Sequence, residues 1–133
     1  MIIKQVSVFL ENRSGRLNEV TRILGKNNVN MVAFSMAENP EFGILRMIVD
    51  DCGKAEKALR EAKFGVSLND VVSLSIPNVS GSLAHVLEVL AAEDIFIEYM
   101  YAFAKEDAAN NAVIVIRPTF VDKCEAVLNK NGL

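Results

Sequence analysis

The stretch Glu11-Asn12-Arg13-Ser14-Gly15-Arg16-Leu17 has a near-copy later in the chain, Pro77-Asn78-Val79-Ser80-Gly81-Ser82-Leu83. Both copies read Asn-x-Ser-Gly-x-Leu, and each lies between an alternating apolar run and an amphipathic helical pattern. Alternation predicts a strand, and apolar residues at helical spacing predict a helix. The same strand–loop–helix unit therefore occurs twice, and we interpret the chain as an internal duplication.

The first copy, residues 1–69, predicts the order β-α-β-β-α-β. Ser14 is the expected N-cap of the first helix, whose apolar stripe starts at Leu17, and Asp50-Asp51 is expected to cap the second helix. A polar turn at residues 38–41 separates the second and third strands. We expect the strands at residues 2–10, 29–37, 44–49 and from 66 onward.

The second copy, residues 70–133, follows with Asn69-Asp70 as the only turn signal. Leu83 starts the apolar stripe of its first helix, and residues 105–111 form a polar loop. The pattern ends with a helix, so the fourth strand of this copy is missing or very short. We expect the strands at residues 71–76, 95–103 and 113–116.

This order predicts an α+β protein of two tandem ferredoxin-like units, residues 1–69 and 70–133, with the second truncated at its last strand. Each unit is expected to be an antiparallel sheet with helices on one face. A truncated sheet leaves an unpaired edge, which favours pairing with the other repeat or with another chain. We therefore expect a homodimer, the commonest symmetric assembly.

Composition excludes several classes of function. Of the 133 residues, 51% are hydrophobic, which is enough for a packed core. A net charge of −3 without a basic stripe argues against a nucleic-acid partner. No apolar run approaches the roughly 20 residues that span a bilayer. We expect a cytoplasmic protein whose Cys52 and Cys124 are reduced thiols.

The two glycine loops are the candidate sites. A strand that turns through glycine into a helix leaves the first helical N–H groups without internal partners, and this suits a small carboxylate. The structural alternative is that glycine makes the turn and serine caps the helix with nothing bound. The residues alone leave both interpretations open.

The stretch Glu11–Leu17, followed by Asn28-Val29-Asn30-Met31, resembles the signature of ACT domains, with serine in place of the usual proline. The match extends through Ala92–Ala102, and the whole chain is similar to small stand-alone proteins of two ACT domains. The resemblance implies a non-catalytic regulatory protein that binds an amino acid. It also allows a metabolic enzyme regulated in trans as a partner.

In ACT domains that bind serine, residues matching Asn12 and Asn30 hold the ligand across a subunit interface. The second repeat keeps Asn78 but has Phe96 in place of Asn30; Phe96 either closes an apolar pocket or belongs to the core, and the core is favoured. Glu98 meets a ligand ammonium or points to solvent. The expected ligand-binding residues are Asn12, Arg13, Ser14, Gly15, Arg16, Leu17, Asn30, Asn78, Val79, Ser80, Gly81, Ser82, Leu83, Phe96 and Glu98.

No catalytic residue, metal site or cofactor is expected. His85 is the single histidine and has no nucleophile at a telling spacing, and Asp50-Asp51 is better explained by helix capping than by metal binding. Two rivals to amino-acid sensing stay open. One is a pure interaction and oligomerisation module with empty loops, and the weaker one is a minor enzyme of ferredoxin-like fold.

Overall fold

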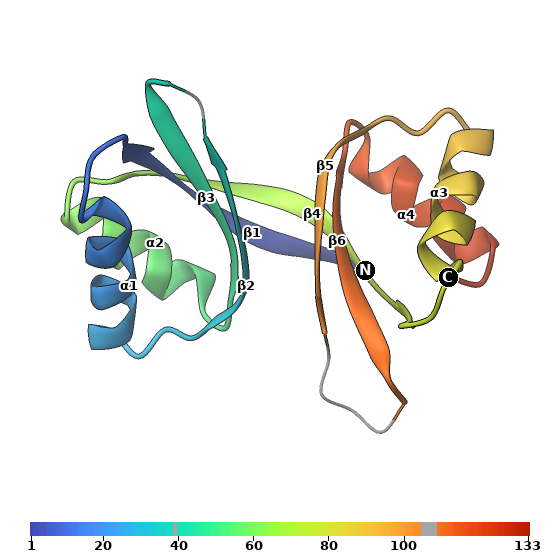
Figure 1. The fold of residues 1–133 in the computed structure, drawn as a ribbon, viewed down its shortest axis with the longest axis horizontal. Coiled ribbons are helices and arrows are strands. Elements are labelled where there is room, and N and C mark those ends of the chain that lie inside the picture. The colour runs from blue at the N-terminus through green and yellow to red at the C-terminus, as the bar shows by residue number, and fades with distance from the viewer. Residues whose placement is uncertain (39, 105–108) are drawn as a thin grey trace. The chain divides into compact units, whose positions relative to one another are not determined.

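The structure is a computed structural model that describes residues 1–38, 40–104 and 109–133, so parts of the expected turn at 38–41 and loop at 105–111 lie outside it. The described residues form an α+β fold with six strands and four helices, as the sequence predicts (Figure 1). In chain order these are β1 (Ile2–Glu11), α1 (Arg16–Lys26), β2 (Met31–Glu38), β3 (Phe42–Val49), α2 (Cys52–Glu61), β4 (Gly65–Pro77), α3 (Ser82–Ala92), β5 (Ile97–Ala104), β6 (Asn111–Pro118) and α4 (Val121–Lys130).

The chain divides into two compact units. The first unit is Lys4–Asn69, and the second unit is Asp70–Leu133 together with Met1–Ile3. In the first unit, hydrogen bonds join the strands in the order β2-β3-β1-β4, and β3 is antiparallel to both of its neighbours. Helices α1 and α2 cover one face of this sheet (Figure 1).

The core of the first unit follows from the alternation in β1. Val6, Val8 and Leu10 face the helices and are buried, and Val8 lies opposite Leu45 on β3. Fully burying one such side chain stabilises the fold by about 1.5–3 kcal/mol. The core is completed by residues of α1, β3, α2 and the segment before β4: Val20, Leu24, Val29, Met47, Val49, Ala55, Leu59, Phe64 and Val66.

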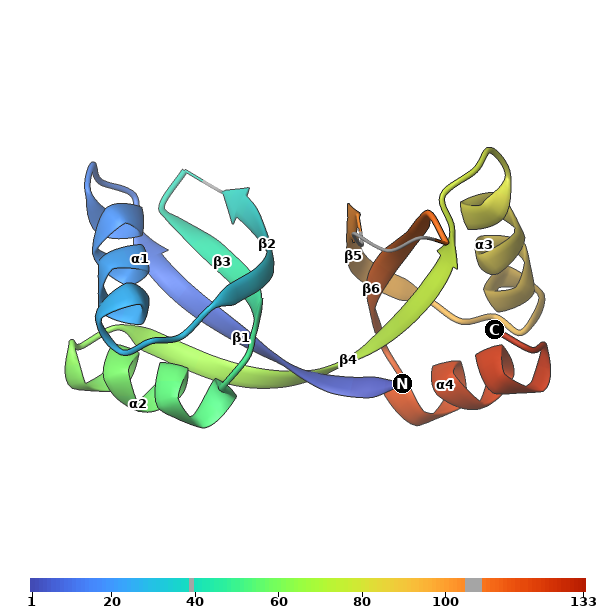
Figure 2. The same ribbon diagram turned by 90° about the horizontal axis from the view of Figure 1, so that it is seen from below.

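The second unit has the strand order β4-β6-β5, with α3 and α4 on one face (Figure 2). Beside β4, Met1 and Ser73 exchange two backbone hydrogen bonds, from Ser73 N to Met1 O at 2.8 Å and from Met1 N to Ser73 O at 2.9 Å. In the first unit, β4 lies beside β1 as the fourth strand. In the second unit, Met1–Ile3 lies beside β4 in the corresponding position. The predicted truncation is confirmed, and the first residues of the chain fill the position of the missing strand.

Strand β4 runs without a break from Gly65 to Pro77, so the expected turn at Asn69-Asp70 is wrong. The Oδ1 atom of Asn69 accepts a hydrogen bond from the hydroxyl of Ser7 at 2.8 Å, and Ser7 is itself buried. A guanidinium N–H of Arg117 donates to the carbonyl of Asp70. The Asn69 side chain and the Asp70 carbonyl are thus bonded to partners distant in sequence within one continuous strand.

Candidate functional site

The first glycine loop links the end of β1 at Glu11 to the start of α1 at Arg16. Gly15 is the N-cap, with a φ of 91°, and no side-chain cap hydrogen bond is found at this helix start among the described residues. The expected cap at Ser14 is therefore wrong. Glycine takes the position because a left-handed backbone is cheap only without a Cβ. The uncapped turn leaves backbone N–H groups and the positive end of the helix dipole available to an anion.

A surface depression of about 330 Å³ lies over this loop. All six predicted loop residues, Asn12–Leu17, line it. The neighbouring strands contribute lining residues that the loop motif does not predict, because strand ends meet only in the folded sheet. These additional lining residues are Leu10, Glu11, Met36, Glu38 and Gly43.

Arg16 is the most constrained side chain of the depression. Its guanidinium carbon lies 4.2 Å from the ring centroid of Phe64, and its Nη1 is 2.7 Å from Glu19 Oε2. A longer pair, at 3.7 Å, joins Arg16 to Glu11. The side chain is 14% exposed, and its buried Nε has no partner among the described residues. Two carboxylates and a ring therefore fix Arg16 at the helix start and offset much of its charge.

Asn12 and Asn30, the two predicted amides, lie at opposite ends of β2. Asn12 follows β1 where β3 and the end of β2 meet, whereas Asn30 precedes β2, with its N–H donating to Asp50 Oδ1 at 2.9 Å. Eight strand residues separate these ends, about 26 Å at 3.3 Å per residue. The first unit alone does not bring the two side chains together. A site that uses both needs a second copy, and this remains a prediction.

The second glycine loop repeats the backbone of the first. Gly81 has a φ of 91° and is the N-cap of α3, and no side-chain cap is found among the described residues. The predicted residues Asn78–Leu83 all lie in this connection or in the first turn. The helical spacing predicts that Leu83 and its counterpart Leu17 start the buried stripes of their helices. They are 39% and 44% exposed, so neither packs in the core. Single exposed leucines are ordinary on a protein surface, so this exposure by itself does not identify a binding site.

The predicted residues at the start of β5 behave differently. Phe96 is 70% exposed, so its assignment to the core is wrong. Glu98 is partly exposed and lies 3.4 Å from Arg117. An ion pair of this kind on an exposed strand is ordinary. The second repeat therefore presents an aromatic side chain where the first presents Asn30.

Other chemistry is poorly supported by the described part of the chain. His85 is exposed, and no group of three His, Cys, Asp or Glu side chains that could hold a metal occurs among the described residues. Asp51 accepts a hydrogen bond from the N–H of Lys54 at 3.0 Å and so caps α2, as predicted. Burial raises the pKa of both the Cys52 and the Cys124 thiol, which disfavours the reactive thiolate. Within the described ranges, no helix is long and apolar enough to cross a membrane.

A β-α-β-β-α-β unit and a second copy that lacks its last strand, each with a positive-φ glycine that starts a helix at the end of a strand, define a tandem of small ferredoxin-like modules. The chain belongs to the ACT domain pair family, which matches residues 1–133. This confirms the family that the loop signature indicates. No curated protein matches the chain.

Solved structures share the fold. Protein BT0572 from Bacteroides thetaiotaomicron is 55% identical, with a TM-score of 0.93 over 99% of this chain and 90% of that chain. The regulatory subunit of aspartate kinase from Thermus thermophilus, in its ligand-free form, is 14% identical, with a TM-score of 0.65 over 98% of this chain and 96% of that chain. The corresponding subunit from Thermus flavus is 13% identical, with a TM-score of 0.68 over 98% and 94%. At these low identities, the likeness to the two kinase subunits shows the fold alone.

Proposed function

We propose that this protein is a non-catalytic, cytoplasmic regulatory protein that binds a free amino acid in the depression over Asn12–Leu17. The observation that carries the proposal is the meeting of all six loop residues around one depression at an uncapped helix start. The first N–H groups of α1 suit the α-carboxylate. The Asn12 amide and the Glu38 carboxylate, which line the same depression, supply partners for the ammonium group.

We further propose that a second copy completes the site. Among the described strands, β2 stands at the end of the hydrogen-bonded order of the first unit. Its side chains Val32, Phe34 and Met36 are 47%, 65% and 40% exposed. Antiparallel pairing of two β2 strands would satisfy the backbone groups at this edge, place the apolar side chains of β2 beside those of the partner and close a two-fold dimer. It would also bring the start of β2, with Asn30, to the depression beside the end of the partner's β2.

A regulatory role follows from this arrangement, because a ligand bound across the dimer stabilises the assembled state by mass action. The aspartate kinase regulatory subunits of similar fold support an enzyme regulated in trans as the partner. The rival function, a pure oligomerisation module, is favoured by the same apolar edge of β2. A dimer whose stability no amino acid changes would establish the rival.

The test is thermal denaturation with each of the twenty amino acids, followed by calorimetry with the one that stabilises the protein. Asn12→Ala or Asn30→Ala should each weaken binding by about 1–3 kcal/mol, because a ligand polar group loses its partner. The control is Asn129→Ala, at an exposed position on α4.

Mixing the two variants tests whether the site is shared. In a mixed dimer, one of the two sites keeps both amides, so an equal mixture should recover about a quarter of the wild-type sites. Recovery of no sites would contradict the shared site. Undiminished binding by both single variants would show that the loop is not the amino-acid site.

A further inference from the structure

Three lysines surround a second depression in the first unit, of about 430 Å³. Lys26 lies in the last turn of α1, and Lys54 and Lys57 lie one turn apart on α2. All three are exposed, and none of their ammonium groups has an ion-pair or hydrogen-bond partner among the described residues. We call Lys26, Lys54 and Lys57 the lysine cluster. The remaining lining residues are Asn27, Asn28, Ala58 and Glu61.

Helix stability does not explain the lysine cluster. A cation such as Lys26 in the last turn of its helix is favourable, because it meets the negative end of the dipole. Lys54 lies in the first turn of α2, where the positive end of the dipole disfavours a cation, and the residues of this first turn include no acidic side chain besides the N-cap Asp51. A local arrangement that lowers helix stability without a visible compensating contact is typical of a functional surface.

The second unit provides an internal comparison. A smaller depression, of about 150 Å³, is lined there by two lysines, Lys123 and Lys130, and by Ala126. Lys123 and Ala126 hold the positions on α4 that Lys54 and Lys57 hold on α2, Lys130 stands where α2 has Glu61, and Ala92 ends α3 as Lys26 ends α1. Lys123 donates a hydrogen bond to the carbonyl of Glu93 at 3.1 Å and so ties α4 to the end of α3.

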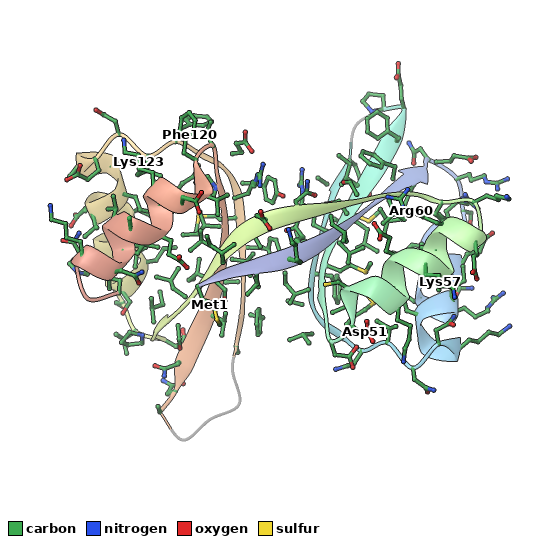
Figure 3. All side chains as sticks on the ribbon, turned by 180° about the vertical axis from the view of Figure 1, so that it is seen from behind. Met1, Asp51, Lys57, Arg60, Phe120 and Lys123 are labelled. Carbon is green, nitrogen blue, oxygen red and sulfur yellow. The ribbon has the colours of Figure 1, made fainter. Side chains whose placement is uncertain are left out.

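The shared fold therefore accepts alanine at two of the three lysine positions. At the third position, the second unit uses the ammonium group internally, as its bond to the helix end shows. Figure 3 shows Lys57 on α2 and Lys123 on α4. The first unit thus carries three positive charges without a described partner, and at two of these positions, Lys26 and Lys57, the second unit has alanine.

We propose that the lysine cluster binds a small, free, phosphate-bearing anion. Lysine ammonium groups are compact point charges that suit phosphate, and the cluster is a local positive site on a chain of net charge −3. The depression is within the range of roughly 300–1,000 Å³ that is usual for small-molecule sites. Glu61 lies one turn beyond Lys57 on α2, so the phosphate group belongs at the Lys54 end and the ligand's hydrogen-bond donors belong near Glu61. This site is separate from the amino-acid site, and either can exist without the other.

The test is a titration of the whole chain with pyrophosphate at low salt, measured by calorimetry and by phosphorus NMR. The double variant Lys26→Ala/Lys57→Ala introduces the residues that the second unit has at these positions, so folding should be retained. It should bind pyrophosphate about tenfold or more weakly, because two of the three positive charges are lost. Glu61→Gln should bind it more tightly than the wild type.

The matched control is Lys123→Ala/Lys130→Ala, which removes the same charge from the corresponding depression of the second unit. The dissociation constant of the control for pyrophosphate should stay within about twofold of the wild-type value, if the lysine cluster attracts the anion locally and the net charge of the chain does not. Equal losses in the two double variants, or no loss in either, would overturn the proposal. A phosphoserine peptide that binds the cluster more tightly than pyrophosphate would also overturn the assignment to a small free anion.

Discussion

Helix α4 begins with an apolar N-cap, and this predicts a measurable gain from one substitution. Phe120 has φ and ψ of −119° and 98°, close to the −143° and 93° of Asp51, the N-cap of α2. Asp51 accepts a hydrogen bond from its helix, whereas no described side chain caps α4. Both residues are labelled in Figure 3. Because the backbone is already in a capping conformation, Phe120→Asp should supply the missing cap.

Two opposing effects determine the size of the change. Phe120 is 69% exposed, so its removal forfeits roughly a third of the 1.5–3 kcal/mol of a fully buried phenylalanine, about 0.5–1 kcal/mol. A new cap contributes about 1 kcal/mol. The two effects nearly cancel in Phe120→Asp alone. The informative quantity is the difference between Phe120→Asp and Phe120→Ala, because both variants lose the same ring.

The assay is urea unfolding of the wild type and the two variants. Phe120→Asp should be more stable than Phe120→Ala by about 1 kcal/mol, and Asp51→Ala should be less stable than the wild type by a similar amount. Position 51 thus serves as the control for position 120, since the same pair of residues is compared at both helix starts. A Phe120→Asp variant no more stable than Phe120→Ala would refute the reasoning from backbone geometry.

Three further predictions follow from local geometry. Gly15→Ala should destabilise the protein by about 1–2 kcal/mol, because alanine is strained in a left-handed backbone. Gly25→Ala, in the ordinary backbone of α1 with open space around it, should stabilise the protein by up to about 1 kcal/mol. Urea midpoints of the two variants that move in the same direction would contradict this. Ser7→Ala should cost about 1–3 kcal/mol in unfolding experiments, because it removes a buried hydroxyl that accepts from the Gln5 amide and donates to Asn69, and a neutral result would contradict the network. Burial raises the pKa of both thiols, so Cys52 and Cys124 should react with a thiol reagent more slowly than free cysteine at pH 8 and faster as the pH rises; a rate equal to that of free cysteine would argue against burial.

The strand–loop–helix order could be predicted from the sequence because it rests on local periodicity. The alternation of Val6, Val8 and Leu10 and the helical spacing of Val20 and Leu24 mark buried faces directly. The predicted turn at Asn69 is wrong because the structure there depends on contacts that are distant in sequence. An amide that looks like a turn signal is bonded to Ser7, a residue far away in the sequence.

The candidate site was predictable only in part. The loop residues Asn12–Leu17 carry a local signature, whereas Met36 and Gly43 join them through strand pairing that no short stretch encodes. The lysine cluster joins two helices, so its members are separated in the chain. A signal for it did exist in the sequence, because aligning the repeats sets Lys57 against Ala126.

The pairing of Met1–Ile3 with β4 has a consequence for synthesis on the ribosome. Residues Met1–Ile3 are synthesised before the whole first unit, whereas residues 70–133, which belong to the same unit as Met1–Ile3, are synthesised after it. Chains are built from the N-terminus at about 5–20 residues per second, and domains generally fold as they emerge. The first unit has all of its strands once β4 is synthesised, whereas Met1–Ile3 belong to a unit whose helices α3 and α4 are synthesised later. If the two repeats were encoded separately, residues 70–133 would lack Met1–Ile3, which belong to their unit. The second unit can therefore be completed only when both repeats are made as one polypeptide.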